Sequence, residues 1–203
     1  TWIIYDTTNS GIPANSMSAF AIDKDNHLWV GSSEKGAAKF DGINWTIYNT
    51  SNSGLPSNAV FNISIDKYNV KWIATFGGGL AKFNDTNWTV YNTGNSGIPN
   101  NVLRTVIIED NIKWVGAYNF NGGVGKYNDT SWIVYNTSNS PLLSNLITAI
   151  NIDIFKDKWI ATQAGGLAKF NSISNSWTIY TTSNSGLPEM NLEYVNIDRN
   201  NIK

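Results

Sequence analysis

Tryptophan recurs along this chain at a nearly constant interval. A Trp opens each of five W-x-x-Y motifs, and successive motifs are separated by 43, 43, 44 and 45 residues: Trp2, Trp45, Trp88, Trp132 and Trp177. A second series keeps the same step: Trp29, Trp72, Trp114 and Trp159. A period of about 20 to 50 residues is typical of repeat proteins, in which each unit packs against its neighbours. We therefore expect a row of similar structural units.

Each unit predicts four short strands. The second unit shows the order: a polar loop, "VFNISID" (60–66), a turn, "KWIAT" (71–75), a Gly-rich turn, "LAKF" (80–83) and "WTVYN" (88–92). Apolar residues alternate at period two, β-branched and aromatic residues dominate, and the period of a helix is missing. Four short antiparallel strands in about 44 residues form the blade of a β-propeller. The predicted fold is therefore all-β, a β-propeller of four-stranded antiparallel blades.

The repeat also predicts where the blades begin and end. We expect four complete blades with partial strands at both ends of the chain. The expected segments are an outer strand and crossing loop at 1–15, blades at 16–49, 59–92, 102–136 and 146–180, and the start of a further blade at 190–203. These form one propeller domain or a segment of a larger one, which further blades or another chain would complete.

A polar loop links each unit to the next, as in "NTSNSGLPSN" at 49–58. Gly supplies a positive φ and Pro fixes φ near −65°, as a crossing between blades requires. An Asn closes the loop in four units: Asn15, Asn58, Asn101 and Asn145. We interpret these side chains as Asx-type bonds to nearby backbone, with a ligand role as the alternative.

The units resemble a known repeat. The run "ISIDKYNVKWIATFGGGLAKFN" (63–84) and its counterparts at 20–41 and 150–171 follow the pattern of the two-component regulator propeller: Asp, a turn, Trp, a small pair, Gly-Gly-Leu and an aromatic residue. The resemblance implies a propeller of bacterial extracytoplasmic sensors, in the periplasm, secreted or at the cell surface. In that family such regions often serve hybrid histidine kinases that respond to polysaccharides.

Composition excludes several partners. The net charge is −1 and acids and bases are interspersed, so no basic patch is predicted for nucleic acid. No apolar run reaches the length of about 20 residues that a membrane span needs, so this segment is not expected to insert into a membrane. Cysteine is absent, which leaves the redox compartment undecided.

The repeated polar residues have structural interpretations that we prefer to chemical ones. The Gly-rich runs precede strands rather than helices, so they predict hairpins and not a phosphate site. The Trp series predict cores between blades rather than a sugar-stacking array. Repeated acids are expected to cap turns rather than to act as paired acid and base: Asp23, Asp66, Asp153 and Asp198. Repeated lysines are expected on a solvated strand face: Lys39, Lys82, Lys126 and Lys169.

The single histidine, His27, lies in a predicted turn and has no second His or Cys to complete a metal site or a triad. We therefore predict no catalytic residues, no metal ligands and no cofactor. A propeller lyase or hydrolase is the least favoured alternative.

The Gly-rich turns are where the repeats differ most. In the third unit, 106–127, this turn is two residues longer, the preceding turn is shorter, and Val replaces the usual Leu. Binding residues often lie on loops carried by a rigid frame, so these turns predict a site for a glycan or a protein partner, as in a sensor or, alternatively, a secreted lectin or adhesin. The candidate residues are Glu34, Phe76, Tyr118, Asn119, Phe120, Asn121 and Gln163. We expect Tyr118 or Phe120 to be exposed on the face of the crossing loops, beside a groove or channel; loop variation without function is the alternative.

Overall fold

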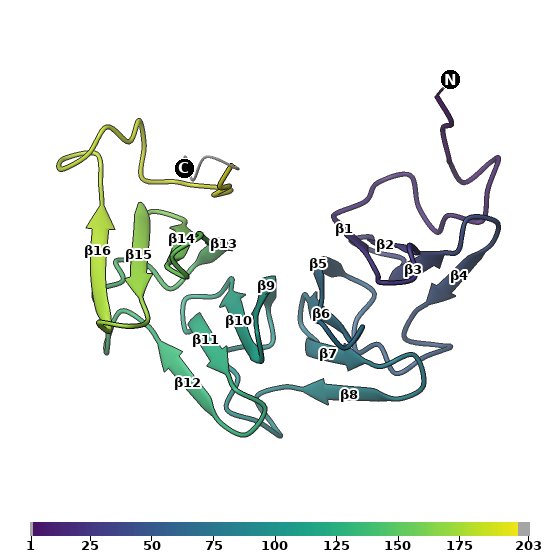
Figure 1. Ribbon diagram of the computed structural model, residues 1–203, viewed down its shortest axis with the longest axis horizontal. Coiled ribbons are helices and arrows are strands. Elements are labelled where there is room, and N and C mark those ends of the chain that lie inside the picture. Colours follow the sequence, from purple (N-terminus) through teal and green to yellow (C-terminus); the bar gives the residue numbers. More distant parts are fainter. Residues whose placement is uncertain (1, 199–203) are drawn as a thin grey trace.

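The computed structural model describes residues 2–198, which form four antiparallel sheets of four strands each (Figure 1). The first sheet contains β1 (Ala19–Ile22), β2 (Leu28–Gly31), β3 (Ala37–Phe40) and β4 (Trp45–Tyr48). The second contains β5 (Val60–Ile65), β6 (Lys71–Thr75), β7 (Gly79–Phe83) and β8 (Trp88–Tyr91). The third contains β9 (Leu103–Glu109), β10 (Ile112–Ala117), β11 (Gly123–Tyr127) and β12 (Trp132–Tyr135). The fourth contains β13 (Ile147–Ile152), β14 (Lys158–Thr162), β15 (Leu167–Asn171) and β16 (Ser176–Tyr180).

The sheets are the blades of a propeller. Strands follow chain order within each sheet, and the first strands of neighbouring sheets are in contact: β1 with β5, β5 with β9, and β9 with β13. The first strands therefore lie innermost, and the blades fan out along an open arc (Figure 1). This confirms the predicted all-β propeller. Within residues 2–198 no helix is long and apolar enough to span a membrane.

The ends of the chain differ from the expectation of partial strands. Residues 2–18 contain no strand, because no neighbouring strand lies beside 2–5 within the described chain. Residues 181–198 contain none either, but Leu192 takes the place of a first inner-strand residue. Its N–H donates to Thr162 O at 3.1 Å and its carbonyl accepts from Thr148 Oγ1 at 2.6 Å. Residues 199–203, the end of the segment in which a further blade is expected to start, lie outside the described residues.

The crossing loops are built as the sequence predicts. Asn58 Oδ1 accepts the Thr50 N–H at 2.9 Å, and the other closing asparagines make the same bond in their own loops. The side chain thus satisfies a backbone donor, which confirms the structural interpretation. A Cβ at Gly54 would lie 2.4 Å from the Cβ of Trp88, so the outer Trp of the next blade covers this loop closely.

The Gly-rich turns also follow from backbone geometry. Gly79 has a φ of +83°, and a Cβ there would lie 2.2 Å from the carbonyl oxygen of Tyr91. Only glycine accepts both constraints without strain. A strand follows each turn, which confirms the predicted hairpins.

Aromatic side chains fill the spaces between blades. Tyr48 stacks on Trp29 of its own blade, with centroids 5.4 Å apart, and contacts Phe83 and Trp88 of the next blade at 5.3 and 5.9 Å. The inner Trp series is buried: Trp29, Trp72, Trp114 and Trp159. This confirms its predicted place in the core. The outer tryptophans of the four blades cover the crossing loops and are half-buried: Trp45, Trp88, Trp132 and Trp177.

Each buried indole is held by an acid from its own blade. The Nε1–H donates to a carboxylate oxygen at 2.9 to 3.0 Å in all four blades: Trp29 to Asp23, Trp72 to Asp66, Trp114 to Glu109 and Trp159 to Asp153. The three aspartates also accept turn amides, as Asp66 Oδ1 does from Tyr68 N and Val70 N, so the predicted capping role is confirmed for Asp23, Asp66 and Asp153. In the third blade Glu109 replaces Asp, because the shortened turn places the acid at the end of the strand.

A lysine from the next blade closes over each of the first three indoles. Lys71 Nζ lies 5.0 Å from the Trp29 ring, Lys113 lies 4.5 Å from Trp72, and Lys158 lies 5.0 Å from Trp114. Lys158 Nζ is also 2.7 Å from Glu109 Oε2, and Lys71 Nζ is 3.9 Å from Asp23 Oδ2. We call this grouping of indole, carboxylate and ammonium the interblade clasp. Each clasp joins the tryptophan and acid of one blade to a lysine of the next blade, about one repeat further along the chain.

The third-strand lysines correct one expectation. Lys82, Lys126 and Lys169 are half-buried, with their Nζ atoms 5.3 to 5.4 Å from the indole of their own blade. They do not form a freely solvated face, because the indole offers an aromatic surface to each ammonium.

Replacing Trp72 with Ala should lower the free energy of unfolding by about 3 to 5 kcal/mol, because it empties a closely packed core and removes the clasp's aromatic centre. Ile173→Ala, at a side chain that is 90% exposed, is the control. Denaturant unfolding measures both. A Trp72→Ala shift as small as that of Ile173→Ala would contradict this packing.

Lys158→Met should lower the free energy of unfolding by about 3 to 5 kcal/mol, because Glu109 would keep its charge without its buried partner. The double variant Lys158→Met, Glu109→Gln should recover part of the loss. Lys67→Met, at an exposed lysine, is the matched control. Equal stability of Lys158→Met and Lys67→Met would show that the clasp contributes nothing.

Candidate functional site

The Gly-rich turns and the crossing loops lie on one face, which we call the loop face. Gly79 N donates to Asn101 O at 2.9 Å, and Gly123 N donates to Asn145 O at 3.0 Å. Asn145 Nδ2 also donates to the carbonyl of Phe120 at 2.8 Å. The candidate turns therefore lie beside the crossing loops, as expected from the path of the chain.

A small cavity opens on the loop face between the second and third blades. It has a volume of about 220 Å³ and is lined by Phe61, Phe76, Leu103, Arg104 and Tyr118. We call it the rim cavity. A larger cavity of about 530 Å³ follows the inner strands and shares Phe61 and Arg104 with it. We call this second one the axial cavity.

Tyr118 borders the rim cavity as expected, and it is half-buried. Its hydroxyl donates to Gln163 Oε1 of the fourth blade at 2.6 Å. The guanidinium carbon of Arg104 lies 4.9 Å from its ring centroid. Two candidate residues from adjacent blades are thus brought together, and an arginine is added to them.

Phe76 supplies the opposite wall of the rim cavity. Half of its side chain is exposed, and its ring lies 5.6 Å from that of Phe61 on the adjoining inner strand. The pair presents an apolar surface facing a polar and charged wall. A ligand with a flat apolar side and polar edges suits such a cavity.

The inserted turn of the third unit carries the most exposed aromatic of the candidates. Phe120 is 80% exposed, which meets the expectation of an exposed ring on this face. Asn119 has a structural part as well, since its Oδ1 accepts Asn121 N at 3.1 Å and its carbonyl accepts Gly122 N at 2.8 Å. Glu34 is exposed on the first blade and does not line the rim cavity.

The sequence pattern does not predict Phe61, Leu103 and Arg104 as site residues. All three lie at the beginning of inner strands, where the repeat pattern indicates only scaffold. One feature of the sequence could have identified Arg104 as a candidate. The other blades carry Ser18, Phe61 and Thr148 at the same position of the repeat, so the scaffold does not determine the residue type there.

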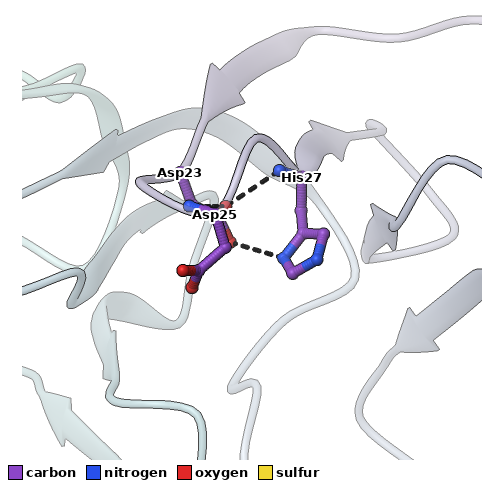
Figure 2. A group of neighbouring side chains, drawn as sticks. All are labelled: Asp23, Asp25 and His27. Carbon is purple, nitrogen blue, oxygen red and sulfur yellow. Dashed lines mark hydrogen bonds and ion pairs between the residues drawn. The ribbon is translucent and has the colours of Figure 1, made fainter.

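The opposite face carries a different polar group, at the turn between β1 and β2 (Figure 2). Asp23, Asp25 and His27 place one ligand atom each within 4.8 Å of one another, which is a spacing that a metal ion accepts. Asp23 Oδ1 already accepts the N–H groups of Asp25 and His27, at 3.0 and 2.9 Å. Its Oδ2 accepts from Trp29 Nε1 and lies 3.2 Å from His27 Nδ1, with the Lys71 ammonium nearby. Turn capping and the clasp therefore account for both oxygens of Asp23, and Asp25 Oδ2 accepts from Asn69 Nδ2 at 3.3 Å.

The hydrogen bonds at Asp23 set its ionisation. Burial alone would raise the pKa of this carboxyl, but the bonds from Trp29, His27 and Asp25 together hold it below its usual value of 3.8. The carboxylate consequently favours the folded state above that value, and the contribution is lost as the pH falls through the lower pKa of the folded protein.

Asp23→Asn should therefore be destabilising at neutral pH, with the difference from the unmodified protein shrinking as the pH falls below 3.8. Urea unfolding at a series of pH values measures this. A free-energy difference that stays constant down to the lowest pH would contradict an ionised role for Asp23.

Comparison with known proteins supports the repeat. The family model described as "Two component regulator propeller" matches residues 11–34. No curated protein matches the sequence. The extracellular domain of a putative one component system from B. thetaiotaomicron is similar at a TM-score of 0.78 and 19% identity, over 96% of this chain and 29% of that one.

Other solved structures share the fold. The extracellular domain of a putative hybrid two component system from B. thetaiotaomicron has a TM-score of 0.68 at 23% identity, over 82% of this chain and 22% of that one. PorZ, a surface component of the type-IX secretion system of Porphyromonas gingivalis, has a TM-score of 0.69 at 19% identity, over 95% and 31%. This chain spans less than a third of each of these structures.

An enzyme shares the fold at lower identity. Virginiamycin B lyase from Staphylococcus aureus has a TM-score of 0.65 at 12% identity, over 81% of this chain and 55% of that one. At such identities the likeness of all these structures concerns the fold alone. The chain is therefore a β-propeller, and its residues 11–34 match the two component regulator propeller model.

Proposed function

We propose that this chain is a non-catalytic ligand-binding propeller of an extracytoplasmic bacterial sensor, and that its loop face binds a glycan. The rim cavity is the observation that carries the proposal. Its walls come from two blades and consist of residues that differ between the repeats, on a frame whose other residues hardly change. Function in such proteins resides in the variable loops of a rigid scaffold.

The chemistry of the rim cavity favours a sugar. Phe61 and Phe76 offer ring faces to the C–H side of a pyranose, and Tyr118 and Arg104 offer polar groups to its hydroxyls. Gln163, which accepts from the Tyr118 hydroxyl, and Asn121 of the inserted turn offer further donors and acceptors outside the lining. A protein partner is the second candidate, because the exposed Phe120 also suits a peptide side chain.

We propose that the chain is not an enzyme because of the residues that line the rim cavity. Of the described residues that line it, only Arg104 and Tyr118 are ionisable, and no carboxylate or imidazole is among them. General acid–base catalysis needs a positioned group that titrates near the working pH, usually His, Asp or Glu. His27 lies on the opposite face, at the turn after β1.

The extracytoplasmic setting is supported by the relatives, two of which are described as extracellular domains. A secreted lectin or surface adhesin remains the alternative, and it would bind glycans with the same face. A membrane-spanning segment and a kinase encoded in the same protein would favour the sensor; a secretion-sorting domain would favour the lectin.

Phe120→Ala should weaken binding to a glycan array about tenfold or more, because the variant loses an exposed aromatic contact without disturbing the core. Tyr118→Ala should do the same and also release Gln163. Phe155→Ala removes an aromatic side chain that is 63% exposed on the opposite face, and should leave binding unchanged. Saturable glycan binding that survives both loop-face changes would place the site elsewhere, and binding of no glycan would contradict the proposal.

A further inference from the structure

Arg104 is the single charged residue among the described residues that line the rim and axial cavities. It lies where the two cavities meet, on the inner strand β9. The equivalent positions of the other three blades carry Ser18, Phe61 and Thr148, so the repeat itself does not require a cation there. Glu193, at the equivalent position after the fourth blade, is the charged residue that pairs with Arg104. A charge that the scaffold does not need is a candidate for recognition.

The guanidinium of Arg104 is held in place but remains accessible. It lies over the ring of Tyr118, and 24% of its side chain is exposed. Its Nη2 lies 2.5 Å from Oε2 of Glu193, a residue whose own side chain is 61% exposed. Exposed ion pairs contribute little to stability, so Glu193 is a weakly held partner that another carboxylate can replace.

Resting on the proposed glycan function, we infer that the loop face binds an acidic sugar, a hexuronic acid, whose carboxylate takes the place of the Glu193 carboxylate on Arg104. The contact with Glu193 shows that a carboxylate reaches the guanidinium in a suitable position. Arginine binds carboxylates through paired N–H groups, which fixes the orientation of the ligand as well as its charge.

The lining of the rim cavity favours a sugar ring over an acidic peptide. Arg104 and the pair of Phe61 and Phe76 line one cavity of about 220 Å³. A hexuronic acid carries its carboxylate directly on a compact ring, so one residue can meet the charge and the apolar wall together. An Asp or Glu side chain brings a carboxylate without a ring.

The test is calorimetric titration of the whole chain with galacturonate, glucuronate and mannuronate oligosaccharides, each beside its methyl ester. The ester keeps the ring and removes the charge. We expect at least one acid to bind about tenfold or more tightly than its ester, and the preference to weaken with added salt. Arg104→Gln should abolish the preference, whereas Lys67→Gln, which removes an exposed charge on the opposite face, should retain it.

Glu193→Gln provides an independent test, because it leaves Arg104 intact and removes the competing carboxylate. The affinity of the Glu193→Gln variant for the acidic oligosaccharide should rise several-fold. Equal binding of acid and ester, or a preference that persists in a folded Arg104→Gln variant, would overturn this inference and leave the proposed glycan function standing. Binding of no sugar would overturn both, and Arg104-dependent binding of a Glu-rich peptide alone would overturn the assignment to a sugar.

Discussion

The hydrogen bond from a buried indole to an acid at the end of the inner strand is the interaction on which the rest of this structure depends. In the first blade, Asp23 satisfies the indole N–H of Trp29, closes the turn between the first two strands and sets its carboxylate 3.9 Å from the Lys71 ammonium of the next blade. The same ammonium lies over the Trp29 ring. Because each clasp uses residues of two units, no blade completes its core alone, and the stability of the arc is shared between neighbours.

This arrangement separates structure from recognition. On the opposite face, Asp23 accepts both turn amides and the Trp29 indole, so both oxygens of this carboxylate take part in the turn and the blade core. The loop face has its own structural devices in the crossing-loop asparagines. The Gly-rich turns lie beside these asparagines, and their side chains differ from blade to blade. We propose the binding site there for that reason.

Periodicity made the fold predictable. The Trp spacing, the four strands of each unit and the glycine turns all follow from local rules of strand and turn geometry. The clasp was not predictable in this way, because it joins a lysine to an indole of the preceding repeat, and a sequence does not show which faces of two blades meet. Glu109 was missed since the shortened turn moves the acid and changes its type. The segment 2–5 has the sequence of an outer strand, but a strand needs a partner to pair with.

The site was predictable only in its turn residues. Phe76 and Tyr118, which line the rim cavity, are predicted as candidates because they depart from a repeated pattern, whereas Arg104 lies in a strand whose alternation suggests plain scaffold. Whether an inner-strand side chain faces a cavity depends on how the blades are spaced around the arc, which no single unit encodes.

The central claim is that ligand is recognised by the variable residues of the loop face while the clasps remain unchanged. Hydrogen–deuterium exchange with and without a bound acidic oligosaccharide tests it most directly. The account predicts added protection at the turns around 76–79 and 118–123 and at the beginning of β9, with none at the turns around 66–70 and 153–157. Protection confined to those opposite-face turns would contradict it.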